Sequence, residues 1–195
     1  MNPKLLEAAA TGNVDDLHRL IREDMFLLDN VSSVGAETPL HIASRRGHLS
    51  FVQEMLKLKK EFASEHNQDG FTPLHLASAN NHLQIVHELL KFDDKLCTIP
   101  GKEQRLPLHC AVVKGRIDVM KELLSAHPDT IESKTATRET LLHLAVKNTQ
   151  FDALKLLVEH AKVLKKEHVL NEKDNQGNTI LHLAASRKQC EERIL

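Results

Sequence analysis

Histidine is the residue type in this chain that could form a chemical site, because it recurs at a regular interval. His41, His75, His109 and His143 are each separated by 34 residues, and His182 follows after 39. A Leu precedes every one of them, and an Ala follows two positions later. Imidazoles are common zinc ligands. The pattern therefore raises two hypotheses, a metal centre built from the histidines or a structural unit that repeats.

The spacing argues against the metal centre. Each histidine belongs to a separate unit, and packed helices lie about 8–10 Å apart, whereas zinc ligands approach the ion to about 2.1 Å. A row with one histidine per unit cannot converge on a single ion. The cysteines Cys97, Cys110 and Cys190 form no CxxC pair or metal-finger spacing. We therefore expect neither a metal site nor a cofactor.

Motifs of catalysis are also missing from the sequence. The seven glycines never come closer than twelve residues, which excludes phosphate-binding loops of the GxGxxG or GxxxxGK type. There is no GxSxG and no HExxH. Cys110 follows His109 directly, but adjacent residues of a helix point apart, so we interpret Cys110 as a small buried residue. We expect that the protein is not an enzyme.

The repeated segments instead predict pairs of short helices. Thr38 and Thr72 are suitable N-caps, each followed by a proline that the first helical turn tolerates. Gly47 or Gly115 can end the first helix in the left-handed conformation, and Asn81 occupies the same place. A second helix with one apolar face follows, as in "HLSFVQEMLK". His48 and His82 open these second helices, where we expect them to be solvated or capping.

Such a period predicts a stacked array, because one helix pair cannot bury its apolar face alone. We predict an all-α solenoid of helix-turn-helix units with short β-turn fingers, forming one domain over 1–195. The predicted units are approximately 1–31, 32–65, 66–99, 100–133, 134–172 and an incomplete 173–195.

The segments "TPLHIASRRGHLSFVQEML" and "TPLHLASANNHLQIVHELL" resemble ankyrin repeats, and they recur in register. More narrowly, the opening "LLEAAATGNVDDLHRLI" and the long fifth unit resemble plant ankyrin-repeat membrane proteins with a C-terminal PGG domain. This resemblance implies a role in defence or stress signalling. The same resemblance implies membrane-spanning helices after the repeats, so that the repeats would lie at the cytosolic face of the plasma membrane. It also implies that the repeated histidines hold neighbouring loops by hydrogen bonds. The implied structural residues are Thr38, His41, Thr72, His75, His109, Thr140, His143 and His182.

Three departures from the repeat pattern stand out. Leu106 replaces the capping Thr, and Leu141 and Ile180 replace the following Pro.

The resemblance further implies a concave binding face, made of finger tips and the exposed side of the first helices. Carried over by position, the predicted partner-binding residues are Glu37, Arg45, Arg46, Phe71, Asn80, Arg105, Lys114, Glu139, Lys147, Asn148 and Arg187. Among them, Arg45, Arg46, Lys114, Lys147 and Arg187 would form a basic ridge, and Phe71 would be an aromatic residue at a finger tip.

Two interpretations of these residues remain open. In one, the ridge is an ordinary solvated face and Phe71 packs on its own loop. In the other, acidic or Tyr/Phe-bearing segments of a protein partner dock there, with arginine and aromatic side chains as anchors. An alternative function is binding of anionic lipid headgroups by the ridge.

Composition narrows the classes of partner. Lys+Arg 26 against Asp+Glu 27 gives a net charge of −1, and aromatic residues make up 3% with no Trp or Tyr. A nucleic-acid-binding protein usually has a basic excess and stacking aromatics. We therefore expect no nucleic-acid partner. We also expect a cytoplasmic monomer that binds a protein and no small-molecule substrate. The three scattered cysteines indicate reduced thiols.

Overall fold

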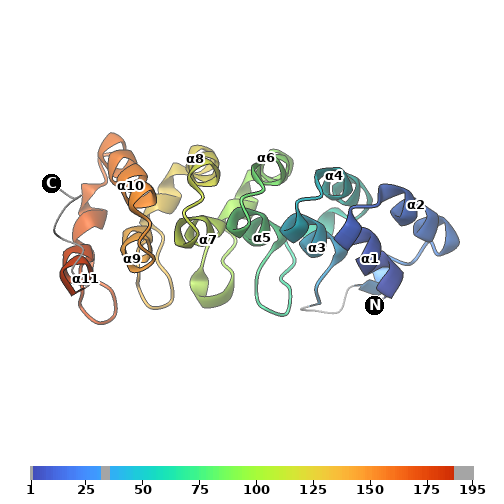
Figure 1. Cartoon of the computed structure of the whole chain (residues 1–195), viewed down its shortest axis with the longest axis horizontal. Coiled ribbons are helices and arrows are strands. Elements are labelled where there is room, and N and C mark those ends of the chain that lie inside the picture. The colour runs from blue at the N-terminus through green and yellow to red at the C-terminus, as the bar shows by residue number, and fades with distance from the viewer. Residues whose placement is uncertain (1, 32–35, 187–195) are drawn as a thin grey trace.

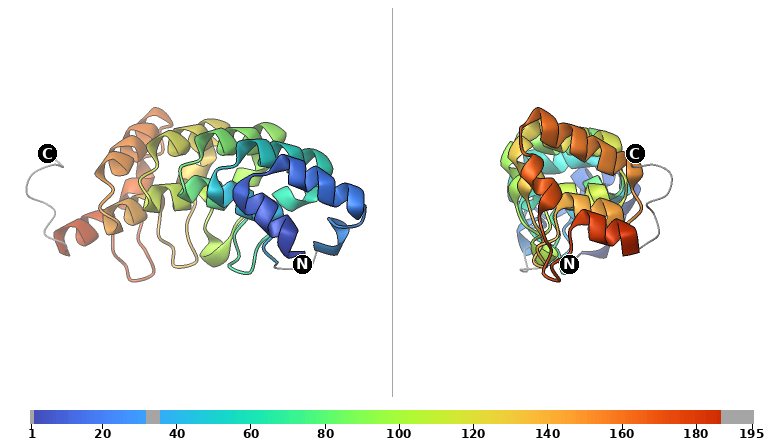
Figure 2. Two further views of the ribbon diagram at one scale, coloured as in Figure 1. Left: turned by 45° about the vertical axis from the view of Figure 1, so that its right-hand side comes forward. Right: turned by 90° about the vertical axis from the view of Figure 1, so that its left-hand side faces the viewer.

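The computed structural model describes residues 2–31 and 36–186, which form an elongated stack of helix pairs (Figure 1). In both views of Figure 2 the helices lie in two layers, with the loops projecting from one side. The inner layer comprises α1 (Pro3–Thr11), α3 (Pro39–Arg46), α5 (Pro73–Ala79), α7 (Pro107–Val113), α9 (Leu141–Lys147) and α11 (Ile180–Ser186). The outer layer comprises α2 (Val14–Glu23), α4 (Leu49–Leu58), α6 (Leu83–Phe92), α8 (Ile117–Ala126) and α10 (Phe151–Val163). Each helix lies within one predicted unit.

Short 3-10 turns follow the outer helices, and one of them, η4 (Lys102–Gln104), lies within a finger. The others are η1 (Asp29–Val31), η2 (Lys60–Ala63), η3 (Asp94–Thr98), η5 (Pro128–Glu132) and η6 (Glu167–Asn171). No β-strand occurs in the described residues, which contain an isolated bridge between Lys134 and Thr140. The predicted all-α solenoid is confirmed.

The inner helices α1, α3, α5, α7 and α9 each end where a left-handed residue turns the chain. Gly47 and Gly115 have φ of 90° and 64°, and Asn81 has φ of 65° at the equivalent place. Glycine adopts this conformation at no steric cost, and asparagine is one of the few other residues that tolerate it. The sharp turn brings the outer helix back over the inner one.

The core runs along the stack between the two layers. Each outer helix buries one face, as α4 does with Phe51, Val52 and Met55, while the inner helices bury their Leu and Ala positions. Contacts pass from each inner helix to the next, α3 to α5 and α5 to α7. The core is therefore continuous, and each unit is stabilised by its neighbours.

Backbone hydrogen bonds hold the fingers in a row. Within fingers, Asn67 N–H donates to the Phe71 carbonyl at 3.0 Å and Gly101 N–H donates to the Arg105 carbonyl at 2.8 Å. Between fingers, Lys102 N–H donates to the Gly70 carbonyl at 2.8 Å. The finger bases are therefore fixed relative to the inner helices.

Candidate functional site: the concave face

Buried histidines lock three of the fingers to the preceding inner helix. Thr38 N–H donates to His41 Nδ1 at 3.2 Å, so Nδ1 is the acceptor and Nε2 carries the proton. Nε2–H then donates to the carbonyl of Phe71 at 3.0 Å in the next unit. His75 donates in the same way to the Arg105 carbonyl at 2.8 Å. One imidazole thus joins a helix N-terminus to the following finger.

The later histidines show which parts of this arrangement are variable. His143 Nε2 donates to the Asn178 carbonyl at 2.9 Å. His109 accepts the N–H of Leu106 at 2.9 Å, although Leu106 has no hydroxyl to complete the cap. His182 pairs with Thr179 but is exposed, in the last unit that the structure describes.

Burial keeps the central histidines uncharged. It lowers the pKa of His41, His75 and His109 to about 4 each, despite backbone hydrogen bonds that act in the opposite direction. These imidazoles are neutral at pH 7 and lie one per unit. They are structural groups, and the described residues contain no cluster of three or more His, Cys, Asp or Glu that could hold a metal ion.

His48 and His82 are capping residues, one of the two roles expected, but neither caps the helix that it opens. His48 Nε2 bonds the Ala10 carbonyl at 2.9 Å, and His82 Nε2 bonds the Arg45 carbonyl at 2.9 Å. Each imidazole therefore caps the C-terminus of the inner helix one unit back, where unpaired carbonyls are available.

The residues that precede each helix cap form the base of the concave face. Their carbonyls fasten the fingers, and their side chains reach the last turn of the inner helix in two units. There Glu37 pairs with Arg45, and Glu139 pairs with Lys147. Burial raises the pKa of Glu139, but hydrogen bonds from Lys147 and Thr137 outweigh it, so the pKa of this carboxyl lies below its ordinary value.

These ion pairs correct the predicted basic ridge. Two of its five cations, Arg45 and Lys147, are neutralised by acidic residues of the same predicted face. Arg187 lies outside the described residues. Arg46 and Lys114 are exposed and make no ion pair with any residue that the structure describes. The positive charge of the ridge is therefore smaller than that of five uncompensated cations.

Three of the predicted partner-binding residues already make polar contacts within the chain. The side-chain amides of Asn80 and Asn148 donate to the carbonyls of Leu76 and Leu144, each at 2.8 Å, at the end of their own helices. Arg105 pairs with Glu103 of its own finger at 2.8 Å. Glu103 was not predicted, and its place on a finger loop gave no signal in the sequence.

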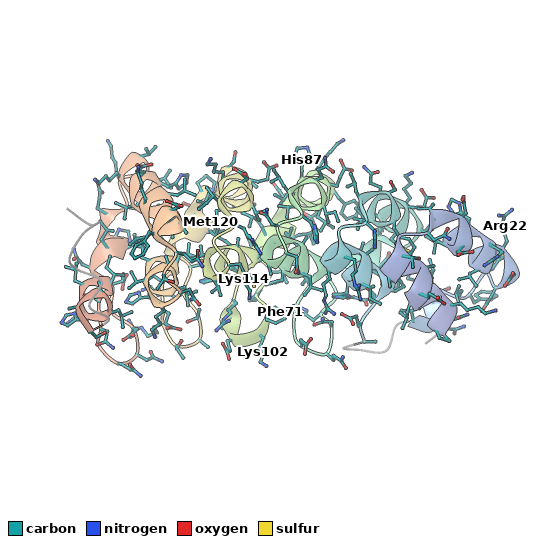
Figure 3. All side chains as sticks on the ribbon, viewed as in Figure 1. Arg22, Phe71, His87, Lys102, Lys114 and Met120 are labelled. Atoms are coloured by element: carbon teal, nitrogen blue, oxygen red, sulfur yellow. The ribbon has the colours of Figure 1, made fainter. Side chains whose placement is uncertain are left out.

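Phe71 lies at the base of its finger, whereas the prediction placed it at the tip. The turn is made by residues 69–70, and the Phe71 ring packs on His75 with centroids 5.6 Å apart. Its other side borders a hollow of about 190 Å³ between α5 and α7. In Figure 3, Phe71 and Lys114 lie together at this junction.

Cys110 also borders the hollow, so the expectation that it is buried requires correction. Its side chain is half-buried, whereas that of Cys97 is fully buried. Burial nevertheless raises the pKa of the Cys110 thiol to about 11. An uncharged thiol is a poor nucleophile at neutral pH, and here it forms part of an apolar wall.

These features describe a rigid, stacked surface of finger bases and inner helices. The family described as ankyrin repeats (3 copies) matches residues 5–99, 61–134 and 108–193. The chain belongs to the ankyrin-repeat family. Ankyrin arrays are in general interaction scaffolds without catalytic activity, so protein–protein interaction is the function that the family indicates.

A plant ankyrin protein shares part of this sequence. The Arabidopsis thaliana protein named ankyrin repeat-containing protein BDA1 is 39% identical over 71 residues. The match spans 36% of this chain and 17% of that relative, well under two thirds of its length. Among the helices that the structure describes, none is both long enough and apolar enough to cross a membrane.

Proposed function

We propose that this ankyrin array is the interaction domain of a plant defence or stress signalling protein, and that it binds a protein partner on its concave face. The observation that carries the proposal is the row of finger bases, three of which are locked to the preceding inner helix by His41, His75 and His143. A surface whose backbone is already fixed loses little conformational entropy on binding.

The proposed pathway and location rest on resemblance. The opening helix pair and the long fifth unit are similar to those of plant ankyrin-repeat proteins with a PGG domain, and an Arabidopsis ankyrin protein matches part of the chain. Association with the cytosolic face of the plasma membrane belongs to the same proposal.

The structure gives less support to lipid binding. A headgroup site needs several uncompensated cations close together, because each contributes only about 1 kcal/mol near an anionic surface. Here Arg45 and Lys147 are held in ion pairs with Glu37 and Glu139. We therefore favour a protein partner over a lipid.

Partner capture from a plant extract, before and after a charge change on the concave face, tests the proposal. The informative variant is Arg46→Glu with Lys114→Glu, because neither cation has an ion-pair partner in the described residues. Reversing Arg45 or Lys147 would also leave an acidic neighbour unpaired, which confuses folding with binding.

The matched control is Lys91→Glu with Lys155→Glu, which makes the same charge change on exposed positions of α6 and α10. We expect proteins retained by the wild type and the control to be lost by the concave-face variant, with circular dichroism unchanged in all three. Loss with the outer-face control alone would contradict the proposal.

A further inference from the structure

The two central units differ from their neighbours at one pair of positions on the concave face. In the second and fifth units this pair is Glu37 with Arg45 and Glu139 with Lys147, and each forms an ion pair. In the third unit the same positions hold Phe71 and Ala79, and in the fourth Arg105 and Val113. In the two central units these positions therefore form no ion pair with each other, and three of the four side chains, Phe71, Ala79 and Val113, are apolar.

A hollow lies between α5 and α7 at this place. Ala79, which borders it, is short where the equivalent residue of the second unit, Arg45, is long. The hollow has a volume of about 190 Å³, enough for one large side chain but not for a folded element. Its lining residues are Phe71, His75, Leu76, Ala79, Arg105, Cys110, Val113 and Lys114.

The floor of the hollow is apolar and its rim is cationic. Leu76, Ala79 and Val113 are half-buried, so their remaining surface faces the opening. Lys114 lies exposed at the rim without an ion-pair partner in the described residues, and the half-buried Arg105 pairs with the exposed Glu103. A ligand that places an apolar group on the floor and a negative group at the rim would complement both.

We propose that this hollow is a subsite for a partner segment with one large apolar side chain, Leu or Phe, beside a carboxylate. The inference rests on the proposed function, because it assigns the partner chemistry of the same concave face. The apolar side chain fills the space over Phe71 and Val113, and the carboxylate pairs with Lys114. The ion pairs of the second and fifth units flank the subsite, as polar rims flank the buried centre of many interfaces.

Synthetic peptides test this assignment directly. The probes are labelled 12-residue peptides of Asp, Glu, Gly and Ser in which one central position is Leu, Phe or Ala, with fluorescence anisotropy as the readout. Burial of a Leu side chain is worth about 1.5–3 kcal/mol. We therefore expect the Leu and Phe peptides to bind wild-type protein at least about tenfold tighter than the Ala peptide.

Two variants separate the apolar floor from the cationic rim. Phe71→Glu with Ala79→Arg transfers the ion pair of the second unit into the third, and it should abolish the preference for Leu over Ala. Lys114→Met should keep that preference but weaken the binding of every peptide in the set, because the carboxylate beside the apolar residue loses its cationic partner. Circular dichroism melts establish that both variants fold, and Lys91→Met on α6 serves as the matched control for the loss of one cation.

The outcomes distinguish this inference from the proposed function. Equal affinity for Leu and Ala peptides, or an unchanged preference in the transfer variant, overturns the subsite while leaving a concave-face scaffold intact. If no peptide of the set binds, or if anionic vesicles bind in their place, the subsite is also wrong. Partner capture with the Arg46 and Lys114 reversals then decides the proposed function separately.

Discussion

In the second, third and fifth units a single imidazole connects two elements through both of its nitrogens. Nδ1 of His75 accepts the N–H of Thr72 at 3.2 Å, and Nε2 donates to the Arg105 carbonyl. Protonation would turn Nδ1 into a donor facing another donor, and it would place a charge where water is excluded. Both effects oppose the charged form, as burial does in lowering the pKa of His41, His75 and His109 to about 4.

These lowered values make folding stability depend on pH. Between pH 6.5 and about 4 the unfolded chain binds protons that the folded chain excludes, so stability is greatest above pH 6.5 and falls as the pH decreases. At pH 5 each of the three histidines should cost about 2 kcal/mol relative to pH 7.5. Urea unfolding followed by circular dichroism at both values measures the sum.

The variant His75→Gln provides the control, since the amide can accept and donate but does not titrate in this range. It should be less stable at pH 7.5 and should lose less stability between pH 7.5 and 5. Equal unfolding free energies of the wild type at the two pH values would contradict the account of buried neutral histidines.

At the scale of elements, the turn from inner to outer helix tolerates a side chain to a different degree in each unit. A Cβ on Gly47 would meet the His82 ring at 2.7 Å, and that ring is held by its bond to the Arg45 carbonyl. A Cβ on Gly115 would meet the amide end of Gln150 at 2.1 Å, which is a flexible side chain that can move away.

Gly47→Ala should therefore cost more than Gly115→Ala. Both pay about 1–2 kcal/mol for a left-handed alanine, and Gly47→Ala also weakens a hydrogen bond worth about 1 kcal/mol. Asn81→Gly, at φ 65°, should be neutral or stabilising. Thermal melts of the three variants check the order. Equal losses for the two glycine variants would show that His82 is not a fixed neighbour.

These elements could be predicted well from the sequence because the features that define the repeat are local. The Thr caps, the left-handed residues and the apolar periodicity each act within a few residues, so they can be seen without a structure. The hydrogen-bond acceptors of His48 and His82 could not be predicted in this way, because they are carbonyls 37 or more residues away in sequence. The pairing of Glu37 with Arg45 was equally hidden, since it needs the finger to fold back over the helix.

At the scale of the whole molecule, small differences between units give the concave surface a charge and polarity that change along the stack. The overall net charge of −1 says nothing about this distribution. Ion pairs on the second and fifth units surround the apolar junction of the third and fourth, where Phe71 and Val113 border the open hollow. Comparison of equivalent positions in the repeat is the signal that could have revealed this junction from sequence.

A role as an interaction scaffold is consistent with this surface. The titratable groups with strongly lowered or raised pKa values, such as His75 and Cys110, are locked in structural bonds or form part of an apolar wall. What differs from unit to unit is the outward-facing chemistry, and that is the property that selects a partner.

Hydrogen–deuterium exchange on the array bound to its captured partner tests the central claim most directly. The account predicts slower exchange in the fingers and inner helices of the central units, at residues 67–80 and 101–114, with α4, α6 and α8 unchanged. Slower exchange confined to the outer helices would place the partner on the opposite face and contradict the proposal of a concave binding surface.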